Sequence, residues 1–326
     1  MAAAIKPGWS KPSTILFACE IPANERAFAF ALAQAVEFGA RLILFHAGAT
    51  REASGPEPSG LLHDESAGAD PAEFEPSEPL NALARRVWEA GVECEIVVRP
   101  GLPASRILAF LRERESVREI DRIVMGAHSP GPIGKLLIGS VAEALLRTVP
   151  LPVCVIGPEV VNGRYRNFAT RTILCGVSLH RSSSMVVGFA AELAAEQNAR
   201  LILLHVIPPH QRPEVLDGRS IGQLEAEMVA LVPAELQGGI KAQPMVVPGD
   251  PTEELLYQGR AEQAGLIVLG ARGASAFAAI TRHGVVYKLL AHAHCPVMTL
   301  SPVVLAACGV NREPAHQGEM FLAGVF

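Results

Sequence analysis

The sequence contains the same series of segments twice, in the same order. The matching pairs are TILFACE and TILCGVS (14–20, 172–178), ARLILFHAG and ARLILLHVI (40–48, 199–207), RIVMGAH and LIVLGAR (122–128, 266–272), and PVCVIGP and PVMTLSP (152–158, 296–302). An ordered internal repeat at this length predicts two copies of one domain rather than one larger fold. Any fold assigned to the chain must therefore fit both halves.

The offset between matching segments falls from 172 − 14 = 158 to 266 − 122 = 144 residues, so the first copy contains extra chain between its second and third apolar runs. This stretch, at about 49–78, is rich in Gly, Pro, Ser and acidic residues and predicts a long surface flap. We expect the first domain at 1–157, a linker at 158–170, the second domain at 171–302 and a C-terminal tail at 303–326.

Within each copy, short apolar runs alternate with segments of helical periodicity. Runs such as 42–45 and 201–206 are apolar on both faces. Such runs are typical of parallel strands that are covered by helices on both sides of a sheet.

Bulk composition excludes several classes of protein. The chain has 326 residues, of which 49% are hydrophobic and 19% charged, so it is globular rather than disordered. A net charge of −5 is not the basic balance of a nucleic-acid-binding protein. No apolar run approaches the roughly 20 residues that span a bilayer, and no signal peptide is evident. Six cysteines without a CxxC pair fit a reducing compartment, so we expect a cytoplasmic protein without membrane or nucleic-acid partners.

A glycine-containing segment follows the fourth apolar run of each copy. In the first copy it is MGAHSPGPIGKLLIGSV (125–141), in which Gly139-Ser140 lies 13 positions after Gly126. In the second copy it is LGARGASAFAAITRHGVV (269–286). Glycines let backbone N–H groups approach an anion, and the start of a helix adds a favourable dipole. A turn between strand and helix also requires glycine, so a purely structural role stays open.

With these motifs, the chain resembles a tandem universal stress protein over about 12–157 and 170–302. The nucleotide-binding branch of that family carries G-x2-G-x9-G-[ST] after the fourth strand and an acidic residue at the end of the first. The resemblance implies an α/β fold of the adenine nucleotide alpha-hydrolase-like type. Its two tandem, open, parallel five-stranded sheets would each have the order 3-2-1-4-5, with helices on both faces. The resemblance also implies that the last strands, at 153–156 and 297–300, lie side by side and pair the two domains within one chain, and a further homodimer stays open. Ligands of such sheets bind at the carboxyl ends of the strands, at the point where the strand order reverses.

The resemblance assigns a candidate nucleotide site to each copy. In the first domain the matching residues are Glu20, Ala47, Gly126, His128, Ser129, Gly139, Ser140 and Val141, with Ser129 in place of the middle glycine. In the second domain, where the match is weaker, they are Val206, Gly270, Gly273 and Gly284. There Ser178 replaces the acidic residue, and His283 takes the position of the last glycine.

Three functions remain open at this stage. The first is a stress-response binding module that holds ATP or a related adenine nucleotide in the first domain, with magnesium only as the nucleotide's own ion. The second is a nucleotide-free scaffold that acts through protein partners. The third, ranked last, is a slow ATPase, for which His128 and Glu20 are candidates by proximity alone. No metal site is recognised, and His46 and His205 at equivalent strand ends are interpreted as structural histidines.

Overall fold

The structure is a computed structural model that describes residues 10–48, 75–115, 120–127, 139–160, 171–179, 183–209, 218–270 and 285–301. The first domain consists of β1 (Thr14–Ala18), α1 (Glu25–Phe38), β2 (Arg41–Gly48), α2 (Glu78–Glu89), β3 (Cys94–Pro100), α3 (Pro103–Glu115), β4 (Arg122–Gly126), α4 (Ser140–Thr148) and β5 (Val153–Ile156). The second consists of β6 (Thr172–Gly176), α5 (Ser183–Glu196), β7 (Arg200–Ile207), α6 (Ile221–Ala230), β8 (Ala242–Pro248), α7 (Pro251–Ala261), β9 (Leu266–Gly270), α9 (Val285–His292) and β10 (Val297–Leu300).

All ten strands belong to one sheet, with the order β3-β2-β1-β4-β5-β10-β9-β6-β7-β8. Each half has the order 3-2-1-4-5 that the resemblance implied, and within each half the strands are parallel. The expectation of two separate five-stranded sheets was wrong. β5 and β10 pair antiparallel, with Val297 opposite Val155 and Thr299 opposite Val153, and their hydrogen bonds join the halves into one sheet. The expected pairing of the last strands is thus confirmed.

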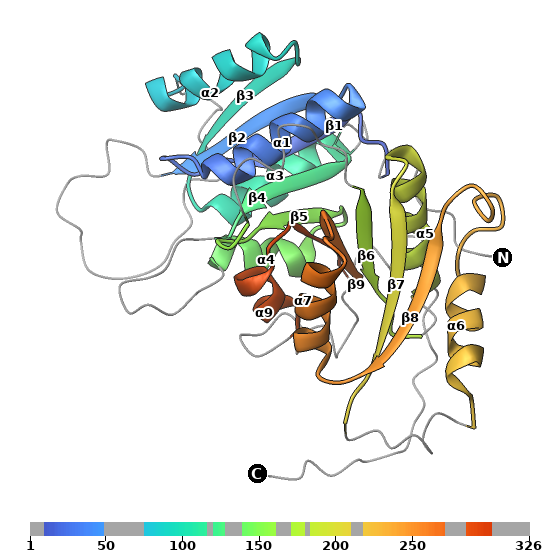
Figure 1. Cartoon of the computed structure of the whole chain (residues 1–326). Helices are drawn as coiled ribbons and strands as arrows, with labels where there is room; N and C mark the ends of the chain where they lie inside the picture. The colour runs from blue at the N-terminus through green and yellow to red at the C-terminus, as the bar shows by residue number, and fades with distance from the viewer. Residues whose placement is uncertain are drawn as a thin grey trace, which may run out of the picture.

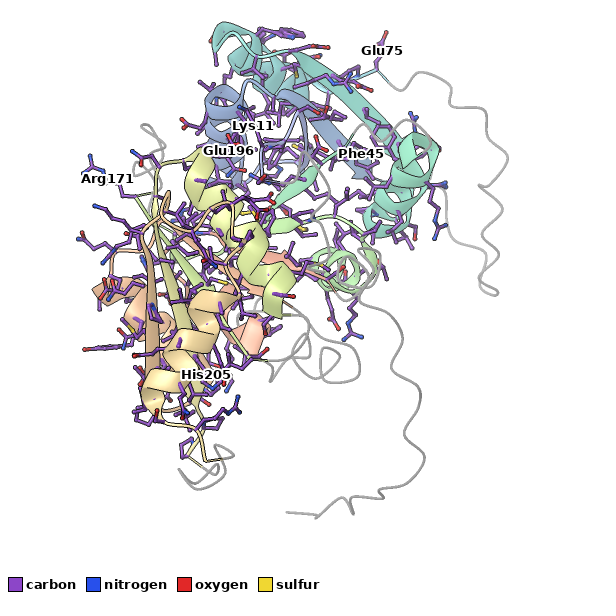
Figure 2. The ribbon with its side chains drawn as sticks, turned by 90° about the vertical axis from the view of Figure 1, so that its right-hand side faces the viewer. Lys11, Phe45, Glu75, Arg171, Glu196 and His205 are labelled. Carbon is purple, nitrogen blue, oxygen red and sulfur yellow. The ribbon has the colours of Figure 1, made fainter. Side chains whose placement is uncertain are left out.

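Figure 1 shows this arrangement, with α2 and β3 at one end of the molecule, β8 and α6 at the other, and β5 between them. Because the halves meet antiparallel, the carboxyl ends of their strands lie on opposite edges of the sheet. Phe45 on β2 and His205 on β7 accordingly lie far apart in Figure 2. A ligand site in one domain therefore opens away from the equivalent site in the other.

Helices cover the sheet in two layers. The apolar sides of α1, α2, α5 and α6 pack on one face, and those of α3, α4, α7 and α9 pack on the other. Each hydrophobic cluster contains residues from both domains, such as Phe28 with Phe189 on one face and Leu145 with Leu289 on the other. The core is therefore continuous across the domain boundary. Among the described residues, no helix combines the length and hydropathy needed to cross a membrane.

Local sequence explains where several helices start and stop. The Asn24 side chain accepts a hydrogen bond from the Ala27 N–H at 3.1 Å and caps α1, which ends at Gly39 with φ +64°. Ser220 and Gln223 form a capping box at the start of α6. The flap expected at 49–78 lies outside the described residues as far as 74, and α2 begins at Glu78.

Polar contacts also join the domains around the β5–β10 pair. The buried Ser301 hydroxyl donates to the Val149 carbonyl at 2.6 Å. Glu159, just after β5, accepts from Arg260 of α7 and contacts His292 of α9, each at 2.9 Å. Lys11 forms a 3.5 Å ion pair with Glu196 of α5, and both are labelled in Figure 2. The exposed ion pairs contribute little individually, so the buried strand pairing and the shared core carry most of the association.

Gly157, the residue after β5, lies against the backbone of α9 in the second domain. A Cβ atom at this position would lie 2.4 Å from the Leu290 carbonyl oxygen, a backbone atom that cannot rotate away. We predict that Gly157→Ala lowers the free energy of unfolding by about 2 kcal/mol or more, because overpacking forces a backbone shift. Urea or thermal unfolding of the full chain measures this.

Gly222→Ala is the matched control for the Gly157 prediction. Gly222 lies in α6, and an added Cβ would meet no heavy atom within 4 Å. We expect this variant to be neutral or more stable by up to about 1 kcal/mol, because alanine favours helix. Equal stability of the Gly157→Ala variant and the wild type would contradict the packing argument.

Candidate nucleotide-binding site

A cavity of about 380 Å³ lies at the carboxyl ends of the first-domain strands. It is bounded by the ends of β1, β2 and β4 and by the first turns of α3 and α4. Its lining residues are Ala18, Cys19, Glu20, Ile21, Phe45, His46, Ala47, Pro103, Ile107, Met125, Gly126, Gly139, Ser140, Val141 and Ala142. This is the crevice that a doubly wound sheet opens beside its first strand.

Six of the residues predicted from the sequence meet in this cavity. They are Glu20, Ala47, Gly126, Gly139, Ser140 and Val141. Two others, His128 and Ser129, lie outside the described residues. The apolar wall, which includes Phe45, Ile107 and Met125, was not predicted from the sequence. The strand alternation could have identified Phe45, because it lies two positions before Ala47 and therefore on the same face of the sheet.

The first turn of α4 presents main-chain donors to the cavity. Gly139 occupies the N-cap with φ −58° and ψ 147° and lacks a side-chain cap, and Ser140 begins the helix. The first N–H groups of an α-helix have no partner within the helix, and together with the helix dipole they favour an anion. The Ser140 hydroxyl adds a further donor. This arrangement can bind phosphate or carboxylate oxygens.

His46 is part of the cavity wall, and its ring has a structural partner. Its Nδ1 lies 2.9 Å from the Cys19 carbonyl oxygen, an acceptor, so Nδ1 carries the proton and Nε2 can accept. In the second domain, His205 Nδ1 lies 2.8 Å from the Val177 carbonyl oxygen in the equivalent position. The hydrogen-bonded role expected for both histidines is confirmed. Each ring joins the end of one strand to the loop that follows its neighbour.

Gly126 meets a packing requirement as well as lining the cavity. A Cβ atom here would lie 2.4 Å from Asn24 Nδ2 and 2.9 Å from Asn24 Cβ. Asn24 is also the N-cap of α1, so its side chain cannot move without loss of the cap. Glycine at 126 therefore allows α1 to start against the end of β4, whether or not a ligand is bound.

The second crevice differs from the first in its packing. An added Cβ at Gly176, the counterpart of Ala18, would lie 2.7 Å from Leu269 Cδ2 and 3.5 Å from Leu255 Cδ2. Leucine methyl groups therefore fill the space that the Ala18 Cβ takes in the first domain. Ser178, in the position of Glu20, lies with its hydroxyl 3.2 Å from the Ser183 hydroxyl.

The predicted second-domain residues are only partly placed. Val206 lies on β7 and Gly270 ends β9, whereas Gly273 and Gly284 lie outside the described residues. Within the described part of the chain, no group of three or more His, Cys, Asp or Glu side chains is arranged to hold a metal ion.

Comparison with known proteins identifies the family. The model of the universal stress protein family matches this chain twice, over residues 13–157 and 169–301, which together make up most of its length. The chain belongs to the universal stress protein family. The two matches coincide with the two halves of the sheet and confirm the tandem organisation.

Individual relatives of this tandem universal stress protein are distant. A universal stress protein of Mycolicibacterium smegmatis is 25% identical over 195 residues, which cover 58% of this chain and 64% of the relative. The chain covers less than two thirds of the length of the curated relatives that it matches.

Two solved structures show the same fold over nearly the whole chain. A universal stress protein from Archaeoglobus fulgidus has a TM-score of 0.61 at 16% identity, and the match covers 90% of this chain and 97% of that one. A protein of unknown function from Pseudomonas aeruginosa has a TM-score of 0.57 at 17% identity, with coverage of 93% and 98%. At these identities the likeness concerns the fold alone.

Cys19 lines the cavity of this universal stress protein, but it is poorly suited to act as a nucleophile. Burial, with a smaller contribution from the neighbouring Glu20, raises the pKa of the Cys19 thiol to about 12. The thiol donates to the Glu20 carbonyl oxygen at 3.3 Å. Because the thiolate is the reactive form, only roughly one thiol in ten thousand is reactive at pH 8.

We predict slow alkylation of Cys19 by iodoacetamide at pH 8, with a rate that rises about tenfold per pH unit between pH 7 and 10. An exposed cysteine of ordinary pKa, about 8.5, levels off within that range. Peptide mass spectrometry measures the rate, and the chain unfolded in urea is the control. Labelling of the folded protein at pH 8 as fast as that of the unfolded chain would contradict the assigned pKa.

Proposed function

We propose that this universal stress protein is a stress-response binding module that holds ATP or a related adenine nucleotide in its first domain. The observation that carries the proposal is the cavity itself. Its lining includes a carboxylate, that of Glu20, the uncapped first turn of α4 and an apolar wall, and this combination supports the proposal. The volume of about 380 Å³ falls in the range of small-molecule sites.

The cavity-lining residues include suitable contacts for the base, the ribose and the phosphates of a nucleotide. The base would lie against the apolar wall that includes Ala47, Met125 and Val141. The Glu20 carboxylate can accept hydrogen bonds from ribose hydroxyls. The phosphates would lie at Gly139 and Ser140, where the N-terminus of α4 offers N–H donors and a favourable dipole. Magnesium would enter only with the phosphates.

A binding role is better supported than a catalytic one. His46, the imidazole described in the cavity, has its Nδ1 held by a backbone carbonyl, and the Cys19 thiol stays protonated at neutral pH. Neither group is arranged as an activated nucleophile with its base. We therefore propose occupancy by nucleotide, rather than turnover, as the property that the protein reports to its partners.

The proposal is tested by ligand-dependent thermal stability. We expect ATP at about 100 times its Kd to raise the Tm by several degrees, because a ligand that binds only the native state stabilises it by about 2.7 kcal/mol at that ratio. We predict that Ala47→Trp abolishes the shift, because the indole fills the hollow against which the base would lie.

The matched control is Val206→Trp, at the equivalent position of the second domain. This variant should keep the ATP-dependent shift, since Val206 lies on the opposite edge of the sheet. Isothermal titration of both variants would confirm the location. If millimolar ATP, ADP and AMP all leave the Tm of the wild type unchanged, the nucleotide proposal fails and the scaffold hypothesis takes its place.

A further inference from the structure

Equivalent corners of the two domains carry opposite charge. The first corner comprises residues 99–106, from the end of β3 into the first turn of α3, and the second comprises 247–254, from β8 into α7. The first contains Arg99 and Arg106 and no acidic residue, which gives +2. The second contains Asp250, Glu253 and Glu254 and no basic residue, which gives −3. Eight matched positions thus differ by five charges.

The two corners share the same backbone, so the difference lies in the side chains. Gly101 N–H donates to the Gly48 carbonyl at 3.1 Å, and Gly249 N–H donates to the Ile207 carbonyl at 3.0 Å. In each corner the next residue is the N-cap of the helix, because its carbonyl accepts the first helical bond, at 3.0 Å for Leu102 and 2.9 Å for Asp250. The register of the two corners is therefore the same.

Capping differs between the corners as well as charge. The Asp250 carboxylate accepts from the N–H groups of Thr252 at 2.8 Å and Glu253 at 3.1 Å, so it occupies the first donors of α7. Leu102, at the same position before α3, is an apolar side chain that is 75% exposed and cannot accept a hydrogen bond. The first corner therefore lacks the fixed negative charge that the second places at its helix start.

The first corner adjoins the cavity. Pro103 and Ile107, on either side of Arg106 in α3, line the cavity wall. Arg106 Nε donates to the Pro100 carbonyl at 2.6 Å, which holds the guanidinium beside the end of β3. Pro100 pairs with Gly48, the residue after Ala47. With neighbouring strands about 4.8 Å apart, the guanidinium lies on the order of 10 Å from the cavity.

We propose that residues 99–106 select the charged nucleotide over its neutral nucleoside through long-range attraction. Arg106 is the main determinant, because it lies between Pro103 and Ile107, which line the cavity. This inference rests on the proposed function and names the ligand class more narrowly, as one with several negative charges. The guanidinium of Arg106 carries a positive charge, and this charge acts at long range even while Nε is bonded to the backbone.

The second corner, residues 247–254, should repel a negatively charged ligand. Asp250, Glu253 and Glu254 raise the local density of negative charge beside the second crevice and repel a polyphosphate. The two crevices lie on opposite edges of the sheet. The field of one corner therefore has little effect on the other at ordinary ionic strength, where the Debye length is about 10 Å. We accordingly expect one nucleotide per chain.

The test compares the affinities of ATP, AMP and adenosine for wild type and Arg106→Glu in magnesium-free buffer at about 0.1 M salt. ATP carries about four negative charges and AMP about two. At about 10 Å with screening, a change of two charges should lower the affinity for ATP roughly tenfold and the affinity for AMP roughly threefold, and should leave the affinity for adenosine unchanged. The loss of ATP affinity should become smaller as the salt concentration is raised. Arg106→Lys, which keeps the charge, should bind ATP nearly as the wild type does.

Two further variants separate charge from damage to the fold. Leu102→Asp should cap α3 as Asp250 caps α7 and should therefore raise the Tm. The same change should lower the affinity for ATP roughly threefold, because it adds one negative charge beside the cavity. Lys241→Glu makes the same change of two charges as Arg106→Glu, at an exposed position just before β8 at the far end of the sheet. It should leave all three affinities unchanged.

The outcomes are distinguishable. If neither ATP nor adenosine binds the wild type, the proposed function fails. Two results would overturn the charge inference while the nucleotide site stands. In the first, ATP binds the wild type but Arg106→Glu lowers the affinities for ATP and adenosine equally. In the second, Lys241→Glu lowers the ATP affinity as much as Arg106→Glu does.

Discussion

The antiparallel pairing of β5 with β10 is the constraint on which the rest of the structure depends. Both strands have four residues and are buried throughout, so neither could remain an open edge in water. Their pairing joins two parallel half-sheets into one and lets the hydrophobic clusters on both faces continue across the boundary. It also determines where the crevices lie. Because the halves meet through antiparallel equivalent strands, the two crevices open on opposite edges of the sheet and cannot share a ligand.

The two copies differ in how side chains pack beside the first strand of each half. In the first copy, Ala18 and Met125 border a hollow, whereas in the second Leu269 and Leu255 close over Gly176. The packing beside Ala18 therefore differs from the packing beside Gly176, while the β5–β10 pairing that joins the two copies is common to both.

Much of the fold was predictable from the sequence, because apolar runs and their repetition report burial directly. The strand order within each half was implied by the resemblance to the family, and the meeting of Glu20, Gly139 and Ser140 followed from the rule that parallel strands bring their carboxyl ends to one edge. The single ten-stranded sheet was not predicted, although the pairing of the last strands was, because a hydrogen-bond register between distant strands leaves no periodic trace in either. The contact of Gly126 with Asn24 could not be predicted either. The spacing of Gly126 and Gly139 matched a phosphate-binding loop, but the packing of Gly126 against the N-cap of α1 is seen only once α1 is placed in the structure.

The comparison of the two halves separates what the backbone determines from what the side chains determine. His46 and His205 make the same bond to the same type of carbonyl, and the loops after β3 and β8 make the same backbone bond to the neighbouring strand. The scaffold of the crevice is thus common to both copies. The differences between the two crevices lie in packing volume and charge, since both halves have the same strand order. A duplicated sheet of this kind contains its own reference, because described residues of the first crevice, such as Ala18 and Glu20, have counterparts in Gly176 and Ser178 that carry different side chains at the same position of the fold.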